Sequence, residues 1–213
     1  MAGVPSENDM KNALILRQGR ELTEKLSKSC VAVCGLGGLG SNIAVSLARA
    51  GVGRLILIDF DKVDITNLHR QQYKASQVRM LKTDALRENL KEISPYIKIE
   101  TYNVFISSEN APKLLSDADI ICEAFDKAEC KAELVNTVLE KLKGKYIAAA
   151  SGMAGMGTPN AIKTRRISKY FYLSGDEVSD VQNEKNLTAP RVMLCAAHQA
   201  SVVLRIIAGE YDI

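Results

Sequence analysis

The chain has 213 residues, of which 46% are hydrophobic and 25% are charged, and its formal net charge is +3. This length fits one large domain with a continuous buried core. So small a charge gives little support to binding of nucleic acid. The N-terminus lacks the apolar core of a signal peptide, and we see no window of the ~20 apolar residues that a membrane-spanning helix needs. We therefore expect a cytoplasmic protein with no membrane partner.

Strands and helices are predicted to alternate through the first 150 residues. Apolar runs without a polar break, such as residues 30–35, are typical of buried parallel strands. Further strands are predicted at residues 54–61, 97–103, 118–125 and 145–151. Helices are predicted at residues 10–28, after the glycine-rich turn at 35–40, and at 76–94, 111–115 and 129–143. This alternation predicts a mainly parallel sheet with right-handed crossovers, flanked by helices, in a Rossmann-like α/β fold.

The last third of the chain changes character. Residues 161–167 and 170–175 are predicted to be short antiparallel strands, and the polar residues 174–188 a mobile loop. Pro190 then opens a closing helix that ends at Gly209. We expect a single domain over residues 1–213. Its parts are an N-terminal helix (10–28), a core (29–150) and a C-terminal segment (151–213).

Glycines at three positions form a G-x-G-x-x-G pattern between a predicted strand and a predicted helix. They are Gly35, Gly37 and Gly40. The first glycine allows a tight turn, the second lets a phosphate approach the backbone, and the third lets the helix and strand pack closely. The helix N-terminus then offers free N–H groups to phosphate. Since the flanking strand and helix are both present, a nucleotide site is favoured over a purely structural turn.

Asp59 ends the second predicted strand, 19 residues beyond Gly40. In a Rossmann domain an acid at this place binds a ribose hydroxyl. Up to this point the pattern fits a nicotinamide-dependent oxidoreductase equally well, and that class is the main alternative.

Polar side chains follow Asp59 closely and favour a different ligand. They are Asp61, Asp64, Asn67, Arg70 and Gln71. The loop leaves the same edge of the predicted sheet as the glycine loop, where α/β proteins bind ligands. A cation and an amide are groups that hold a triphosphate. A solvated turn is the competing interpretation.

Lys82 and Asp126 are two further candidates with plain alternatives. On the residues alone Lys82 is predicted to be a surface lysine about one turn into a helix that carries other basic residues. Asp126 follows the fourth predicted strand. An aspartate there suits Mg²⁺ that bridges phosphates, or the N-cap of the next helix.

Taken in order and spacing, these motifs resemble one family. GLGGLG, a strand ending in D-x-D, N-x-x-R-Q, a downstream lysine and a strand-end aspartate are similar to the ThiF/MoeB/HesA adenylyltransferases, relatives of the ubiquitin-activating enzymes. The resemblance runs from about Lys28 to the end of the chain. The closing segment resembles short ThiF-type proteins of thiamine biosynthesis.

The resemblance implies roles for particular residues. Phosphates would lie on the glycine loop, formed by Gly35, Gly37, Gly38 and Gly40. Asp59 matches the acid on the ribose, and Asp61 the second acid of the D-x-D pattern, whose task stays open.

Cationic and amide residues match the part of the family site that surrounds the triphosphate. Asn67 and Arg70, with Gln71 beside them, match the residues that contact it. Lys82 matches the phosphate lysine, which overrides the prediction of a surface lysine. Asp126 matches the Mg²⁺ ligand.

The implied activity is ATP-dependent adenylation of the C-terminal glycine carboxylate of a ubiquitin-like sulfur carrier, similar to ThiS and ending in Gly-Gly, with ATP and Mg²⁺ as cofactors. The tail of the carrier would enter the site as an extended strand, and the loop at residues 174–188 would cover it. The same fold also suits ATP-dependent activation of a small molecule or of tRNA. The resemblance implies a homodimer.

The chain departs from the family pattern at two places. It has no C-x-x-C pair, so we expect no zinc. Many members begin with an R-Y-x-R-Q segment whose arginine enters the partner subunit's site. Arg17 and Arg20 are the candidates here, at a shorter spacing from Gly35.

Cysteine chemistry is a further question, because some relatives use a cysteine in a thioester or persulfide. Cys195 is the candidate that we single out, and His198 lies one turn beyond it. Their helix is nearly all apolar, which raises a thiol pKa and favours a structural role for both side chains. No role is assigned to His69, inside the nucleotide loop.

Overall fold

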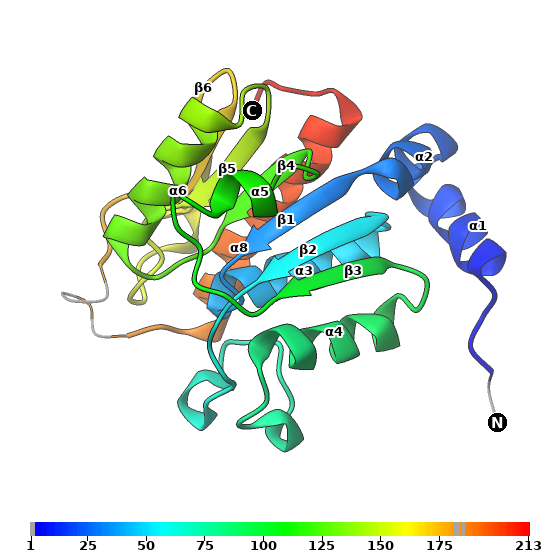
Figure 1. Ribbon diagram of the computed structural model, residues 1–213, viewed down its shortest axis with the longest axis horizontal. Helices are drawn as coiled ribbons and strands as arrows, with labels where there is room; N and C mark the ends of the chain where they lie inside the picture. The colour runs from blue at the N-terminus through cyan, green and yellow to red at the C-terminus, as the bar shows by residue number, and fades with distance from the viewer. Residues whose placement is uncertain (1–2, 181–183, 185) are drawn as a thin grey trace.

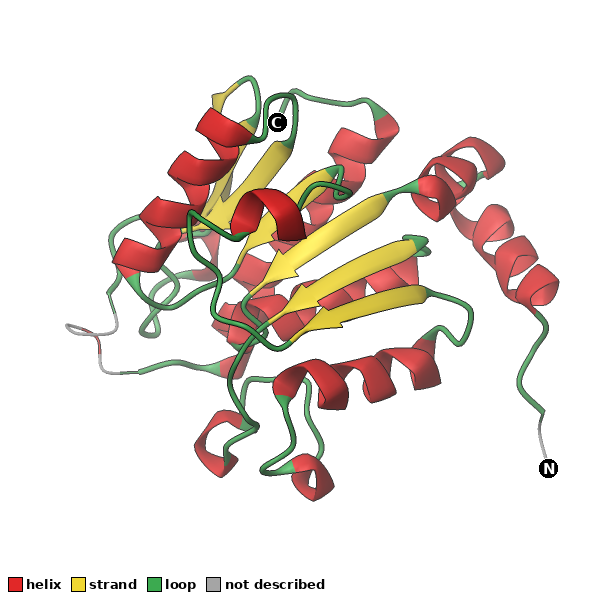
Figure 2. Cartoon of the chain, viewed as in Figure 1, coloured by secondary structure: helices red, strands yellow, loops and turns green. Residues whose placement is uncertain are grey.

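The computed structural model describes residues 3–180, 184 and 186–213, and within them it contains a seven-stranded sheet with helices on both faces (Figure 1, Figure 2). The strand order is β3-β2-β1-β4-β5-β7-β6. The strands are β1 (Cys30–Cys34), β2 (Arg54–Ile58), β3 (Lys98–Tyr102), β4 (Ile120–Glu123), β5 (Tyr146–Ala150), β6 (Lys163–Ser168) and β7 (Phe171–Gly175).

The predicted Rossmann-like fold is confirmed by the strand pairing. Strands β1 to β5 and β7 pair in parallel, and β6 pairs with β7 in the antiparallel sense. The chain runs outward from β1 to β3 and then returns to β4 on the other side of β1. This reversal creates a switch point at the carboxyl ends of β1 and β4, where such sheets bind ligands.

The helices follow the prediction closely, with two corrections. They are α1 (Glu7–Gln18), α2 (Arg20–Lys28), α3 (Gly38–Ala50), α4 (Lys82–Ile93), α5 (Ala111–Leu114), α6 (Ala128–Lys141) and α8 (Ala189–Ala208), with short 3-10 turns at Ile65–Asn67, Ala75–Gln77 and Pro159–Ala161. The N-terminal helix is two helices, since Gly19 separates them with a φ of 87°. Helix α4 begins at Lys82 and not near residue 76, because residues 79–82 bond to residues 61–63 instead.

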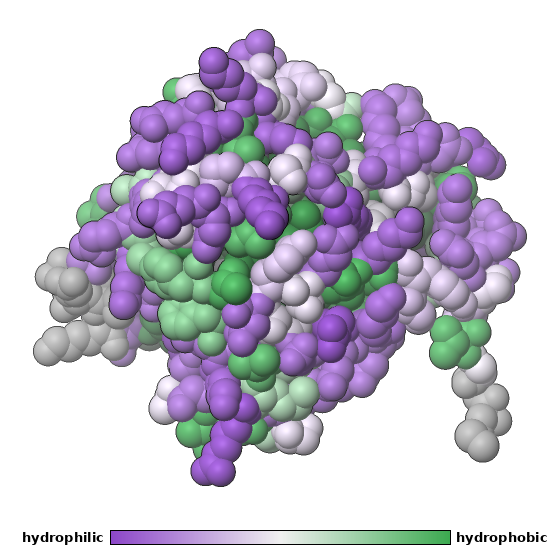
Figure 3. Space-filling model, viewed as in Figure 1, coloured by the Kyte–Doolittle hydropathy of each residue, from purple (hydrophilic) through white to green (hydrophobic). Residues whose placement is uncertain are grey.

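Two hydrophobic layers cover the sheet. The side chains of β1 alternate between them, with Val31 and Val33 in one layer and Ala32 and Cys34 in the other. Helices α3, α4 and α8 contribute to the first layer, and α5 and α6 to the second (Figure 1). Hydrophilic residues cover much of the face that carries α5 and α6 (Figure 3). All five β1 residues are buried, as expected for the centre of a parallel sheet.

Helix α8 corrects the expectation that no segment is long and apolar enough to cross a membrane. It has 20 residues, and an 18-residue window within it has a mean hydropathy of 1.4. Half of that window (50%) is buried inside the protein. Its buried apolar side chains belong to the first hydrophobic layer. A strongly apolar helix is found in protein cores as well as in membranes, and α8 packs here as a core helix. The loop predicted at 174–188 includes residues 181–183 and 185, which lie outside the described residues.

Candidate functional site

The glycine loop joins β1 to α3, and at two of its glycines, Gly35 and Gly40, backbone oxygen atoms leave no room for a side chain. Gly35 has a φ of +89°, and a Cβ there would lie 2.8 Å from the carbonyl oxygen of Ala124. At Gly40 a Cβ would lie 1.8 Å from the Gly35 carbonyl oxygen. Gly37 differs, because the nearest atom to its Cβ would be Nε2 of Gln71 at 3.8 Å. The space above Gly37 is therefore open to a ligand, as a phosphate loop requires.

The N-terminus of α3 faces this open space. The helix begins at Gly38, and no side chain caps it. Its first N–H groups have no partner within the helix, and its dipole is positive at this end. Gln72, in the segment between β2 and α4, donates hydrogen bonds to the side chains of Ser41 and Asn42 in α3. A rigid, uncapped helix N-terminus is suited to binding an anion.

Asp59 holds the glycine loop in place through a hydrogen bond to its backbone. The residue is 8% exposed at the end of β2. Its Oδ2 accepts a hydrogen bond from Leu36 N–H at 2.6 Å, and its Oδ1 accepts one from Asp61 N–H at 2.8 Å. Each carboxylate oxygen can accept a second bond, so Asp59 keeps capacity for a ribose hydroxyl.

Lys82 is buried, so the surface position predicted from the residues alone is wrong. It is the first residue of α4, and its side chain is 7% exposed. Nζ lies 2.8 Å from Oδ2 of Asp61 and 3.8 Å from Oδ2 of Asp59. A buried ammonium needs such partners. The structure thus brings Lys82 to the same strand end as the D-x-D pair.

Asn67, Arg70 and Gln71 lie together beside the glycine loop. Oδ1 of Asn67 accepts a hydrogen bond of 2.8 Å from Nε2 of Gln71. Gln71 is 6% exposed and Oε1 has no hydrogen-bond partner. A Cβ at Gly38 would lie 3.5 Å from Cγ of Arg70, which places the arginine stem over the start of α3. Burial lowers the pKa of Arg70, and the charge of Asp126 opposes that shift.

Asp126 occupies the turn between β4 and α6 and is exposed. The predicted N-cap role is wrong, because Lys127 is the N-cap residue and no side chain caps the helix. Within residues 3–180, 184 and 186–213, no group of three or more His, Cys, Asp and Glu side chains is placed to hold a metal. Mg²⁺ in nucleotide sites is commonly held by one or two carboxylates together with phosphates. The exposed Asp126 carboxylate near Arg70 fits that arrangement.

Sequence analysis missed a buried polar cluster behind Asp126. Glu123, at the end of β4, has no exposed surface and forms a salt bridge with Lys131 of α6. Nε2 of Gln199, from α8, donates to the carbonyl oxygens of Glu123 and Ala148. A charged residue inside the apolar run at 118–125 was the signal for this cluster.

Cys195 and His198 take structural positions. Cys195 has no exposed surface, its thiol donates to the Ser174 carbonyl oxygen at 3.7 Å, and burial raises its pKa to about 12. Nδ1 of His198 lies 3.0 Å from Oγ1 of Thr164. The two side chains therefore bond to different partners. Cys130, at the start of α6, is the one cysteine of the five that is partly exposed.

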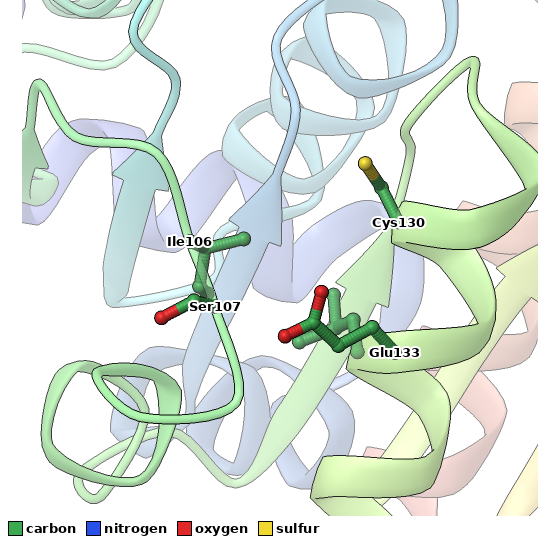
Figure 4. A pocket seen from close by; sticks show the side chains of 5 residues that line it. Ile106, Ser107, Cys130 and Glu133 are labelled. Atoms are coloured by element: carbon green, nitrogen blue, oxygen red, sulfur yellow. The ribbon is translucent and has the colours of Figure 1, made fainter.

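Two hollows lie away from the predicted site residues. One, next to Cys130, lies between residues 106–107 and α6 (Figure 4), and it is too tight to admit a water molecule. The other, a groove of about 670 Å³, lies at the amino ends of β4 and β5, and its lining includes Lys25 and Lys28 of α2 and Lys143 and Lys145 before β5. The predicted site residues instead border the carboxyl edge of the sheet.

Arg17 and Arg20 lie far from the glycine loop of their own chain. They flank the junction of α1 and α2, which leads into the amino end of β1 (Figure 1). Arg20 pairs with Glu24 on the same helix. Either arginine would meet a nucleotide only in a second copy of the chain.

Comparison with known proteins shows which proteins this chain is similar to. The ThiF family model matches residues 10–213. The adenylyltransferase and sulfurtransferase UBA4 of Candida glabrata is 34% identical over 195 residues, which are 88% of this chain and 44% of that protein. The molybdopterin-synthase adenylyltransferase of Haemophilus influenzae is 34% identical over 155 residues, 70% of this chain and 63% of that protein. The chain thus spans less than half the length of the UBA4 protein.

A solved structure shares the fold over nearly the whole chain. The E. coli tRNA N6-threonylcarbamoyladenosine dehydratase TcdA, in complex with ATP, matches with a TM-score of 0.86 and 20% sequence identity. The match covers 98% of each chain.

Proposed function

Because the chain belongs to the ThiF family, as its motifs predicted, we propose that it is an ATP-dependent adenylyltransferase acting on the C-terminal glycine carboxylate of a ubiquitin-like sulfur carrier. The observation that carries the proposal is the gathering of Arg70, Lys82 and Asp126 around an uncapped helix N-terminus. Two cations, free N–H groups and an exposed carboxylate suit a magnesium-bound triphosphate.

The proposed reaction needs little acid–base chemistry. A carboxylate oxygen of the carrier attacks the α-phosphorus of ATP, the bond between the α- and β-phosphates breaks, and its electron pair leaves with pyrophosphate. The product is an acyl-adenylate. Because the carboxylate is already ionised at neutral pH, no general base is required.

The residues of the site would place two anions together and neutralise the charge that develops. Arg70 and the helix N-terminus face the glycine loop, and Lys82 reaches the same edge from α4. Fixed charges of this kind stabilise a transition state more than mobile water does. Asp126 would hold Mg²⁺, which when bound neutralises phosphate charge.

The names of the relatives support adenylation and leave the carrier open. UBA4 is named an adenylyltransferase and sulfurtransferase, and the H. influenzae relative is named for molybdopterin synthase. We propose a carrier similar to ThiS because the closing segment resembles short ThiF-type proteins. An oxidoreductase is disfavoured, since a nicotinamide site has no use for the phosphate cations and Asp126 together.

Mass spectrometry of the carrier tests the proposal. The protein is incubated with Mg-ATP and a ThiS-like carrier ending in Gly-Gly, with a carrier lacking its last glycine as control. We expect a carrier adenylate with the full tail alone. Adenylation of a molybdopterin-synthase-type carrier instead would reassign the partner. ATP consumption that depends on tRNA or a small molecule, with no carrier adenylate, would contradict carrier activation.

A further inference from the structure

A short antiparallel ladder pins the start of α4 to the end of β2. The N–H group of Lys82 donates to the Asp61 carbonyl oxygen at 3.0 Å, and Val63 exchanges backbone bonds with Met80 and Arg79 at 2.8 and 2.9 Å. Lys62 and Leu81 form an isolated bridge within it. The backbone of Lys82 is therefore held directly beside Asp61.

The side chains of Asp61 and Lys82 also pair with each other. The Asp61 carboxylate is half exposed, whereas the Lys82 side chain is 7% exposed and reaches Oδ2 of Asp61 at 2.8 Å. Asp59 is more distant from Nζ, at 3.8 Å, and both of its oxygens already accept backbone N–H groups. Asp61 is thus the one carboxylate within hydrogen-bonding distance of this ammonium among the described residues.

We infer that Asp61 is a positioning residue that holds the Lys82 ammonium in place for the triphosphate, and this inference rests on the proposed function. A lysine ammonium has three N–H donors. Among the described residues one of them bonds Asp61, and Asp59 lies at 3.8 Å, beyond hydrogen-bonding distance, so donors stay available for a phosphate oxygen. Asp61 therefore orients the cation without blocking it.

Holding the cation in advance has a kinetic consequence. A free lysine side chain loses rotamer entropy when it is fixed in one place, and a cation that must reorient during the reaction stabilises developing charge less well. Loss of Asp61 should therefore slow turnover more than it weakens the binding of ATP.

The first test is a kinetic comparison of Asp61→Asn with wild type in carrier adenylation. We expect kcat to fall about tenfold or more, with the KM for ATP changed less than about threefold. Asp61→Glu, which restores a carboxylate, should recover part of kcat. Asp84→Asn is the matched control, because Asp84 lies in the same first turn of α4 and pairs with Arg87 instead.

A second test does not require the proposed function. Amine acetylation followed by mass spectrometry measures how fast Lys82 reacts in the nucleotide-free protein. We expect slow labelling in wild type and labelling at least about fivefold faster in Asp61→Asn, since the ammonium is released to solvent. Unchanged labelling, or a rise in KM with kcat unchanged, would overturn the inference. An inactive wild type with faster labelling in the variant would refute the proposed function alone.

Discussion

Both carboxylate oxygens of Glu123 lie 3.0 Å from Nζ of Lys131, in a salt bridge whose acid has no exposed surface. The same lysine donates to the Ala150 carbonyl oxygen, and Glu123 accepts the N–H group of Phe125. The pair therefore joins the ends of β4 and β5 to α6. It also shapes the turn that carries Asp126.

We predict that Glu123→Ala lowers the free energy of unfolding by about 3–5 kcal/mol, because it leaves a largely buried lysine without its charge partner. Urea unfolding at neutral pH measures the change. Glu140→Ala, at an exposed position on α6, is the control and should change stability by less than about 0.5 kcal/mol. Equal changes in the free energy of unfolding in the two variants would contradict a large contribution of the buried ion pair to stability.

The pH dependence of stability gives a separate prediction for Glu123. Burial raises its pKa above the ordinary value of 4.5, although Lys131 opposes the shift. A group whose pKa rises on folding adds stability below its ordinary pKa and loses it as pH rises through the folded value. Wild type should therefore lose stability relative to Glu123→Gln as pH rises from 4.5. Urea unfolding across pH 4.5 to 8 measures this difference, and a constant difference contradicts the prediction.

The glycine loop offers a matched pair of variants. Gly40→Ala should destabilise the protein by about 3 kcal/mol, because its Cβ would overlap the Gly35 carbonyl oxygen. Gly37→Ala should fold normally, since its Cβ meets no atom closer than 3.8 Å. It should weaken ATP binding about tenfold or more, because the methyl group fills the space of a phosphate. Urea unfolding and calorimetric titration with Mg-ATP measure the two effects. Unaltered ATP affinity of Gly37→Ala would place the phosphates elsewhere.

The features that could be predicted from the sequence are those set by residues close together in the chain. The strands were recognisable because parallel strands buried on both faces are short apolar runs, as at 30–35. The glycine loop was recognisable because its glycine spacing is typical of a phosphate loop between a strand and a helix. Lys82 could not be placed from its neighbours in sequence, since its burial depends on Asp61, 21 positions away.

The polar cluster at Glu123 shows the same limit. The charged residue was visible within its apolar run, but its partners Lys131 and Gln199 come from two helices that only the folded chain brings together. The start of α4 was misplaced for a related reason. Arg79 has a φ of 76° and bonds to Val63 across the ladder, which ends the helical pattern before Lys82.

Thiol reactivity should separate Cys130 from the other cysteines. Cys130 is partly exposed, whereas the remaining four are buried, and burial raises the pKa of Cys30 to about 11 and of Cys122 to about 12. An aromatic disulfide reagent at pH 8 should modify one thiol quickly and the others only on unfolding, since the thiolate is the reactive form. Cys130→Ser should remove the fast phase. A fast phase that persists in this variant would point to an opening of the core near another cysteine.

The most direct test of carrier adenylation is ATP–pyrophosphate exchange with Mg²⁺ and a Gly-Gly-tailed carrier, in wild type and in Asp126→Ala. We predict exchange that requires the carrier and that falls at least about 100-fold in the variant. Because Asp126 is exposed, its substitution should leave the stability of the protein unchanged. Tight Mg-ATP binding without exchange in the presence of any such carrier would contradict acyl-adenylation of a carrier protein.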